Sequence, residues 1–393
     1  MSAATHNGEV DARCRSRVVS LWPAPMDRAY FLGTWAMMIA GIVFVFSASF
    51  PVAGRPDPLG MPGNAYRYLW QHTQYVALGF ALLLAFSVIP PRALRRAAMP
   101  AFVVALALLF LTLVEPWGME LNGARRWLDP PLLPAFQPAE LMKVAFIMLV
   151  AALLARRDEM REGGGIAYVT VLLAVVPLAA ILLKQPDLGM AMMFMAITLA
   201  MLFFAGASVA KLSCLGLLVA AGGGAMAWVE PYRWRRVIAF IDPENATSDD
   251  RYHIVNMLIA QARGGVTGLG LGMSPDKWRS LPAAHTDSIF SVIGCELGLV
   301  GALVMLAAIG LLTMRALHIA RHARSPFGFY LASGIGAMLC LQSLAHIAVN
   351  TSCMPCTGLT LPFISGGGTS LISASIAAGM VLAVSRYENG CEP

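Results

Sequence analysis

The segment LPAAHTDSIF, from Leu281 to Phe290, leads into an apolar run that extends to Leu312 and contains one further charged residue, Glu296. A helix needs roughly 20 apolar residues to cross the hydrocarbon core of a bilayer, and this run is long enough. His285 and Asp287 therefore stand at the entrance of a predicted membrane helix. Because ionisable groups are costly at such a place, an imidazole and a carboxylate there indicate a functional site.

The composition of the whole chain indicates the same environment. Of its 393 residues, 58% are hydrophobic and 13% are charged, and the mean hydropathy is +0.67. These values are typical of a polytopic membrane protein and exclude a soluble enzyme. We therefore expect an all-α integral membrane protein, and we expect no nucleic-acid partner.

Apolar segments of membrane-spanning length recur about ten times along the chain. The predicted spans are residues 29–50, 71–89, 97–115, 137–155, 166–183, 188–206, 212–230, 286–312, 328–350 and 368–385. The first 28 residues are polar and lack the apolar core and cleavage site of a signal peptide. We expect residues 1–28 to form a cytoplasmic tail, residues 29–385 the transmembrane domain and residues 386–393 a second cytoplasmic tail.

Arginines concentrate in connections on one side of the predicted spans, and Lys211 and Arg386 fall on that same side. These arginines are Arg92, Arg95 and Arg96 in one connection, Arg156, Arg157 and Arg161 in the next, and Arg315, Arg321 and Arg324 in a third. The positive-inside rule places these connections and both termini in the cytoplasm. Two substantial loops then lie on the outer side, at about residues 116–136 and, between the seventh and eighth spans, at about residues 231–285.

The second outer loop is rich in cations, namely Arg233, Arg235, Arg236, Arg251, Arg263, Lys277 and Arg279. Such a cluster on the outer side fits an anionic partner, for example a lipid-linked phosphate or diphosphate. The alternative is a solvated loop in which acidic residues such as Asp242 and Asp276 balance the charge. The charges alone leave both interpretations open.

Several blocks of sequence, in a specific order and spacing, resemble the SEDS family (FtsW/RodA/SpoVE). They are Ser47-Ala-Ser49, Asn122-Gly-Ala-Arg-Arg-Trp127, Gln137-Pro-Ala-Glu-Leu-Met-Lys143, Gln185-Pro-Asp-Leu-Gly189, Arg236 with Phe240-Ile-Asp-Pro243, Gly264-Gly265 to Gly272, His285-Thr-Asp287 and Thr357-Gly-Leu-Thr-Leu-Pro-Phe-Ile-Ser365. The last block is more similar to the FtsW branch than to the RodA branch.

The resemblance implies a peptidoglycan glycosyltransferase that polymerises lipid II into glycan strands at the outer face of the bacterial cytoplasmic membrane. The FtsW likeness implies septal synthesis in cell division. The implied partners are a class B penicillin-binding protein and other membrane proteins of the divisome or elongasome. The resemblance also implies that Asp287 is essential and that Trp127 is functionally important.

The reaction itself calls for groups of these kinds. Joining a sugar hydroxyl to an anomeric carbon that carries a diphosphate requires deprotonation at one end and charge neutralisation at the other. Asp287 could act as the base, as an electrostatic partner of an oxocarbenium-like transition state, or as a metal ligand. Arg233, Arg236 and Lys277 are candidates for stabilising the departing diphosphate, and Arg126 of the Asn-Gly block is a candidate for binding the substrate.

A divalent cation, Mg or Mn, bridged by the substrate and bound through Asp287 could contribute to that neutralisation. No cysteine and histidine pattern has zinc spacing, and no organic cofactor is expected. Cys353-Met-Pro-Cys356 could form a disulfide in an exported loop, or its thiols could be small apolar packing residues.

Further polar residues and glycines also allow structural interpretations. His285 could contact substrate or simply bond the loop before its helix. Glu140 and Lys143, three residues apart on one helix face, could pair with each other or contact substrate. Asp187 could cap the next helix, and the glycines from 264 to 272 could approach a phosphate or serve close packing.

The chain departs from the pattern of the family at Ser288, Cys295, His253 and Gly366, where an aromatic residue, Glu, Gln and Tyr are usual. These departures leave two alternatives to polymerase activity. One is a non-catalytic scaffold for a penicillin-binding protein, and the other is a transporter that flips lipid II. No clear internal repeat of the kind common in transporters is present.

Overall fold

The computed structural model describes residues 26–54, 64, 66–121, 124–131, 134–160, 164–229, 234–235, 238, 240–242, 248–279 and 281–388. Within these ranges, the predicted spans coincide with helices α2 (Arg28–Ala53), α3 (Arg67–Ser87), α4 (Pro91–Leu111), α5 (Pro138–Met160), α6 (Gly164–Lys184), α7 (Leu188–Phe204), α8 (Val209–Val229), α12 (Ile289–His322), α13 (Pro326–Asn350) and α14 (Gly368–Glu388). Seven of them are long and apolar enough to cross a membrane, and α6 and α7 contain shorter apolar helices. The multi-span helical prediction is confirmed.

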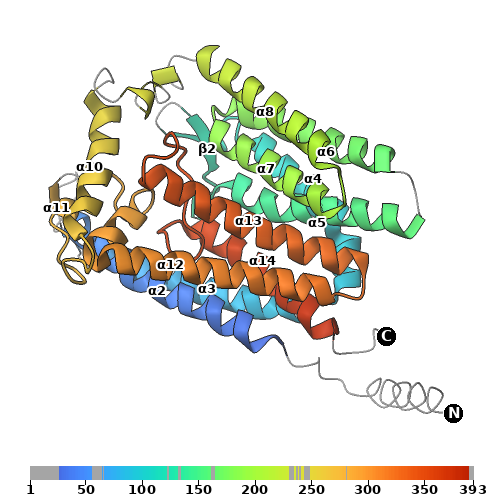
Figure 1. Cartoon of the computed structure of the whole chain (residues 1–393), viewed down its shortest axis with the longest axis horizontal. Helices are drawn as coiled ribbons and strands as arrows, with labels where there is room; N and C mark the ends of the chain where they lie inside the picture. The colour runs from blue at the N-terminus through green and yellow to red at the C-terminus, as the bar shows by residue number, and fades with distance from the viewer. Residues whose placement is uncertain are drawn as a thin grey trace.

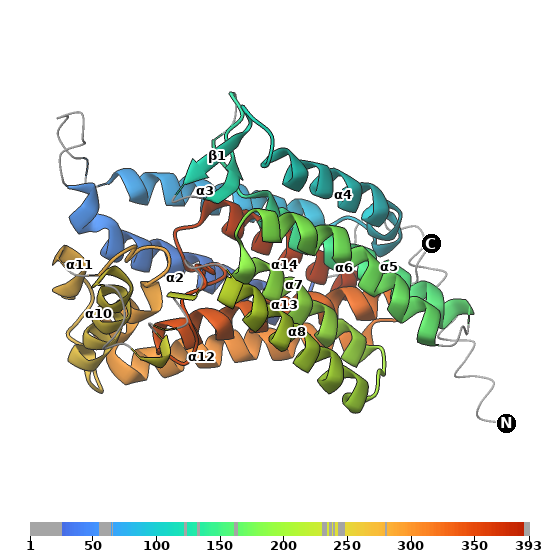
Figure 2. The same cartoon turned by 90° about the horizontal axis from the view of Figure 1, so that it is seen from above.

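The long helices run roughly side by side along the long axis of the molecule (Figure 1). Helices α5 and α14 are mostly buried, whereas the apolar window of α8 has no buried residue. Helix α14 packs along α3, and α13 packs along α12 and α5. Figure 2 shows α8 and α4 towards opposite edges of the bundle. The exposed apolar side chains of α8 suit contact with lipid tails, which are as apolar as leucine.

The loop at 116–136, which was predicted to lie on the outer side, contains a short antiparallel hairpin that the all-α prediction missed. Strands β1 (Gly118–Leu121) and β2 (Ala124–Leu128) pair with Met119 opposite Trp127, and a bulge follows Met119. The strands are too short for their side-chain alternation to stand out in the sequence. The Asn122-Gly123 dipeptide is the signal that would have indicated a hairpin.

The second loop predicted to lie on the outer side contains helices α10 (Ser248–Gly264) and α11 (Asp276–Arg279). Both lie beyond the start of α12, at one end of the bundle (Figure 1). Helix α10 packs on α12, and α11 packs on α2. Much of this predicted loop is therefore ordered structure against the helices, which places its polar groups close to the entrance of α12.

Helix α12 is interrupted at Gly298, whose φ of +66° is not helical. A break of this kind leaves backbone carbonyls without their helical donors. The amides of Leu269 and Gly270 supply those donors, to the carbonyls of Cys295 (3.0 Å) and Glu296 (2.9 Å), and two bonds return from α12 amides to the same segment. The glycine-rich segment therefore serves close packing on α12 and not, at these amides, the binding of phosphate.

At the opposite end, Asp27 connects the start of α2 to α12 through an ion pair and to α14 through a hydrogen bond. The guanidinium of Arg315, on α12, holds both carboxylate oxygens of Asp27 at 2.7 to 3.1 Å. The hydroxyl of Ser385, on α14, accepts a bond from the Asp27 amide (3.1 Å). The chain thus enters α2 and leaves α14 at the same end of the bundle, as the topology predicted for its two termini.

The contact of the glycine-rich segment with α12 predicts a large effect of Gly268→Ala. Gly268 has a φ of +81°, and a Cβ there would overlap the Glu296 carbonyl oxygen. The left-handed backbone alone costs about 1–2 kcal/mol for a residue with a side chain, so we expect a clearly lower unfolding temperature in detergent. Gly224→Ala on α8, where a Cβ meets nothing within 4 Å, is the control and should not lower it. Equal unfolding temperatures would contradict this packing role.

Candidate functional site

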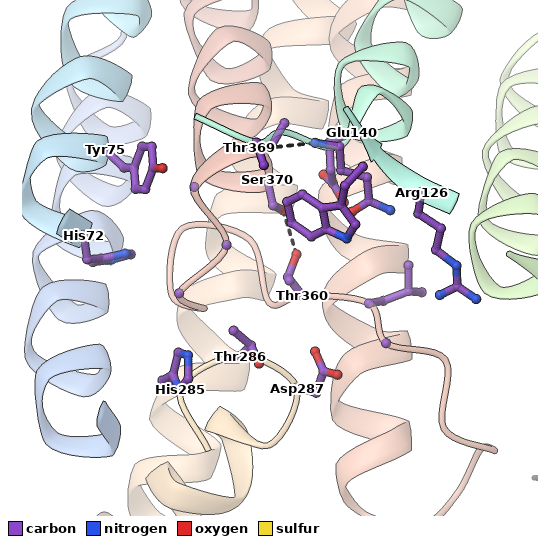
Figure 3. Close-up of a pocket in the computed structure, with 18 of the residues that line it drawn as sticks. His72, Tyr75, Arg126, Glu140, His285, Thr286, Asp287, Thr360, Thr369 and Ser370 are labelled. Carbon is purple, nitrogen blue, oxygen red and sulfur yellow. Dashed lines mark hydrogen bonds between the residues drawn. The ribbon is translucent and has the colours of Figure 1, made fainter. Parts of the chain in front are cut away.

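Asp287 lies on the wall of a cavity of about 500 Å³. Helix α3, strand β2, the start of α5, the turn between α6 and α7, the turn before α12 and the segment from residue 357 to the start of α14 all contribute to the wall. Figure 3 shows His285, Thr286 and Asp287 on one connecting segment, with His72 and Tyr75 on α3 to one side. Segments far apart in the sequence therefore meet at one polar cavity.

The backbone around Asp287 is held by hydrogen bonds from α13. The side-chain amide of Asn350 donates to the Asp287 carbonyl oxygen (2.9 Å), and its oxygen accepts bonds from the amide and hydroxyl of Ser291 (3.2 and 2.9 Å). On the cavity side, a Cβ built at Gly358 would lie 4.0 Å from Asp287 Oδ2. Asn350 thus fixes the turn from which this carboxylate reaches the cavity.

His285 packs its ring against Tyr68 of α3, with 4.9 Å between the ring centres. Its carbonyl oxygen accepts a bond from the Gly366 amide (2.8 Å), so the backbone, and not the imidazole, makes the contact between these loops. Burial lowers the pKa of His285. The imidazole is therefore neutral at neutral pH, and its buried Nδ1 has no partner among the described residues.

Arg126 and Trp127 reach the cavity from β2. The Arg126 guanidinium donates to the carbonyl oxygens of Gln185 (3.4 Å) and Pro186 (2.5 Å), and Nε lies 3.7 Å from Asp187 Oδ2. Asp187 also accepts a bond from the Met190 amide (3.1 Å), which confirms its predicted role as the cap of α7. Burial raises the pKa of Asp187, while Arg126 opposes that rise.

Glu140 and Lys143 form an ion pair of 2.9 Å inside the bundle, with side-chain exposures of 4% and 1%. The Lys143 ammonium also donates to Gln342 Oε1 (2.5 Å), and the Gln342 amide donates to the Thr360 carbonyl oxygen (2.9 Å). Glu140 lines the cavity and Lys143 does not. The predicted pairing is confirmed, and it connects α5 through α13 to the segment that carries Thr360.

A family model described as "Cell cycle protein", for FtsW, RodA and SpoVE, matches residues 28–390. The chain belongs to the FtsW/RodA/SpoVE family. It is 35% identical, over 91% of its length and 86% of the relative's, to the "Probable peptidoglycan glycosyltransferase FtsW" of Idiomarina loihiensis. The protein of the same name from Geobacter sulfurreducens is 37% identical, over 93% of this chain and 96% of the relative.

Solved structures of two family members have the same fold. A chain in a study of polymerization and crosslinking by a peptidoglycan synthase complex gives a TM-score of 0.73 at 28% identity, covering 93% of this chain and 98% of that one. The rod shape determining protein RodA of Thermus thermophilus gives 0.67 at 27% identity, with the same two coverages. The FtsW/RodA/SpoVE fold therefore extends over nearly the whole chain.

Not every predicted site residue of this family member faces the cavity. Asp287, Trp127, Arg126, His285 and Glu140 line it. The Lys277 ammonium instead lies 2.9 Å from Glu296 Oε1 and 3.0 Å from the Ser47 hydroxyl, at 3% side-chain exposure. Because this ammonium already has buried partners, Lys277 is not among the proposed substrate contacts. Arg233 and Arg236 lie outside the described residues.

Two departures from the family pattern contact each other. His253 Nε2, on α10, lies 3.2 Å from the hydroxyl of Ser288, next to Asp287. His253 Nδ1 lies 3.8 Å from the sulfur of Cys356, and no disulfide joins Cys356 to Cys353. A Cβ on Gly366, a third departure, would lie 2.9 Å from the His285 carbonyl oxygen. These substitutions adjoin the cavity and leave Asp287 in place.

Sequence reasoning missed the polar residues of α13 and α3 that support or line the site. Gln342, His346 and Asn350 follow one another at intervals of four along an apolar helix and are all buried. This spacing puts them on one face, and a polar face within a membrane helix is a signal that could have found them. His72 and Tyr75 on α3 line the cavity as well.

Breaking the buried ion pair should destabilise the protein strongly. Glu140→Gln leaves the Lys143 ammonium without its carboxylate, and removing one partner of a buried pair costs about 3–5 kcal/mol. The double variant Glu140→Gln with Lys143→Met should recover much of that loss, because no unpaired charge then remains. Thermal unfolding in detergent measures both effects.

The control is Glu159→Gln, which removes the exposed partner of Arg95, where the carboxylate side chain is 43% exposed. Exposed pairs contribute about 0–1 kcal/mol, so the unfolding temperature should change little. An equal effect of Glu140→Gln and Glu159→Gln would contradict the importance of the buried pair.

Proposed function

We propose that this protein is a peptidoglycan glycosyltransferase that polymerises lipid II into glycan strands, and that it does so in septal synthesis. The observation that carries the proposal is the Asp287 carboxylate in a cavity that Arg126 and Trp127 also line. Similarity over nearly the whole chain to proteins named as probable FtsW glycosyltransferases supports the reaction and the branch.

In the proposed reaction a hydroxyl oxygen of one sugar attacks the anomeric carbon of another. The bond from that carbon to the diphosphate oxygen breaks, and the lipid diphosphate leaves with its electron pair. Asp287 accepts the hydroxyl proton, as a general base does. Its carboxylate also suits the positive charge that develops at the anomeric carbon.

Arg126 is the proposed partner of the departing diphosphate. Its guanidinium is fixed by the turn between α6 and α7, to which Nε and Nη2 donate hydrogen bonds. A guanidinium held in place in this way needs no reorganisation when charge develops on the leaving group. Trp127, its neighbour on β2, supplies an aromatic surface to the same cavity.

The cellular setting follows from the same comparison. The peptidoglycan synthase complex whose chain resembles this one combines polymerization with crosslinking. We propose that this protein likewise works with a class B penicillin-binding protein, among other proteins of the divisome. The arginine-bearing connections and both termini then face the cytoplasm, with the cavity, α10 and α11 on the outer side of the cytoplasmic membrane.

We also propose a substrate-bridged Mg²⁺ or Mn²⁺ ion. Within the described ranges, no group of three or more His, Cys, Asp or Glu side chains could hold a metal. Diphosphate oxygens would therefore supply most of the ligands, in keeping with the preference of these ions for oxygen, and Asp287 would be the protein ligand as an alternative to its role as the base. The ion would neutralise charge on the leaving diphosphate.

Asp287→Ala should abolish polymerisation by the purified protein in complex with its cognate penicillin-binding protein. Loss of a general base lowers the rate by about 10²–10⁴-fold, and gel analysis of the glycan made from lipid II measures it. Asp129→Asn, which changes an exposed acid after β2, is the control and should keep the parent rate.

The same assay separates the alternatives. Polymer from the parent and none from folded Asp287→Ala supports the enzyme. No polymer from the parent, together with full complementation of growth by Asp287→Ala, would support a scaffold. Movement of lipid II across vesicles that contain the parent, without polymer, would support a transporter.

Chelation should test the metal proposal. EDTA should stop polymer formation, and added Mg²⁺ or Mn²⁺ should restore it, while the unfolding temperature of the substrate-free protein stays the same. An unchanged unfolding temperature is expected because most ligands come from the substrate. Full activity in EDTA would contradict the proposal.

A further inference from the structure

One side of the cavity carries buried nitrogen atoms that have no hydrogen-bond partner. His72, on α3, is 3% exposed, and its Nε2 is unpaired among the described residues. His285 Nδ1 is buried and unpaired in the same way. Both residues line the cavity, and Figure 3 shows His72 and His285 on neighbouring parts of its wall.

Such atoms are unusual because leaving a buried polar group unsatisfied costs about 1–3 kcal/mol. The two charged side chains Arg126 and Glu140, elsewhere on the wall, have partners in the protein: Arg126 bonds the turn before α7, and Glu140 pairs with Lys143. The unpaired atoms therefore mark the part of the cavity where a ligand can supply hydrogen bonds that the protein does not.

The chemistry of this part suits an uncharged, hydroxyl-rich ligand. A neutral imidazole offers one donor and one acceptor, which match hydroxyl and acetamido groups. Burial lowers the pKa of His285, which keeps that ring neutral. Tyr68 and Tyr75 also line the cavity and supply aromatic surface. Among the described residues that line the cavity, Arg126 is the only lysine or arginine, so it is the cation available to bind a diphosphate.

We propose that His72 and His285 form a carbohydrate subsite that hydrogen-bonds the sugars of the lipid-linked substrate, while Arg126 binds its diphosphate. This assignment rests on the proposed function and adds which end of the substrate each part of the cavity takes. His72 is its most specific element, because it lines the cavity, is almost completely buried and has an Nε2 without a partner among the described residues.

Binding of two lipids by the full-length protein in nanodiscs tests the assignment. One probe is lipid II, and the other is undecaprenyl diphosphate, which has the same charged group and no sugar. His72→Leu should weaken lipid II binding by about fivefold to tenfold, the contribution of one hydrogen bond, and leave undecaprenyl diphosphate binding unchanged. Arg126→Gln should weaken the binding of both lipids.

Two further variants separate binding from folding. His72→Leu removes an unsatisfied buried group, so its unfolding temperature should equal or exceed that of the parent. His72→Gln keeps hydrogen-bonding capacity and should retain more of the lipid II affinity than His72→Leu. His318→Leu, which changes an exposed histidine at the far end of α12, should leave both affinities unchanged.

The outcomes distinguish this inference from the proposed function. If the parent binds both lipids and His72→Leu weakens neither, or weakens both equally, the carbohydrate subsite alone is overturned. If the parent binds neither lipid, the proposed function fails and the subsite fails with it. Selective loss of lipid II affinity in a stable His72→Leu protein supports the subsite.

Discussion

Glu140 and Lys143 carry opposite charges at a depth in the bundle where neither is more than 4% exposed. A charge in that environment persists only if it is paired and its remaining bonds are satisfied. Gln342 supplies such a bond to Lys143 and another to the backbone of Thr360. The interactions that neutralise these two charges thus connect α5 to α13, and α13 to the segment of the cavity wall that carries Thr360.

The same rule governs the backbone where the helices are interrupted. Helix α12 breaks at Gly298, and the glycine-rich segment before α11 satisfies the carbonyls that the break exposes. Beside this contact, Lys277 and Glu296 pair in a second buried ion pair. Asp287 precedes α12, and Asn350 holds its backbone. The polar cavity therefore stands on a scaffold whose own polar groups are largely satisfied.

The wall of the cavity itself divides by chemistry. Arg126 forms an ion pair with Asp187 and donates a hydrogen bond to the turn before α7, so that part of the wall is charged and its side chains are held in place. His72 and His285 lie on α3 and on the turn before α12, and their unpaired nitrogens make that part neutral and open to a ligand. A substrate that joins a diphosphate to a sugar presents the same two chemistries side by side, and this match links the fold to the proposed reaction.

The spans and Asp287 could be predicted from the sequence because hydropathy is local and the His285-Thr-Asp287 block is contiguous. The hairpin was missed because its strands are too short to show a pattern. The roles of Lys277 and His72 could not be predicted either, since they depend on distant residues: the Lys277 ammonium is paired with Glu296 and Ser47, while His72 Nε2 has no partner in the part of the chain that the structure describes. The sequence by itself determined which segments enter the membrane and which residues carry charge. Only the tertiary structure decided which polar groups are paired and which remain for a ligand, because pairing depends on distances between helices that are remote in the chain.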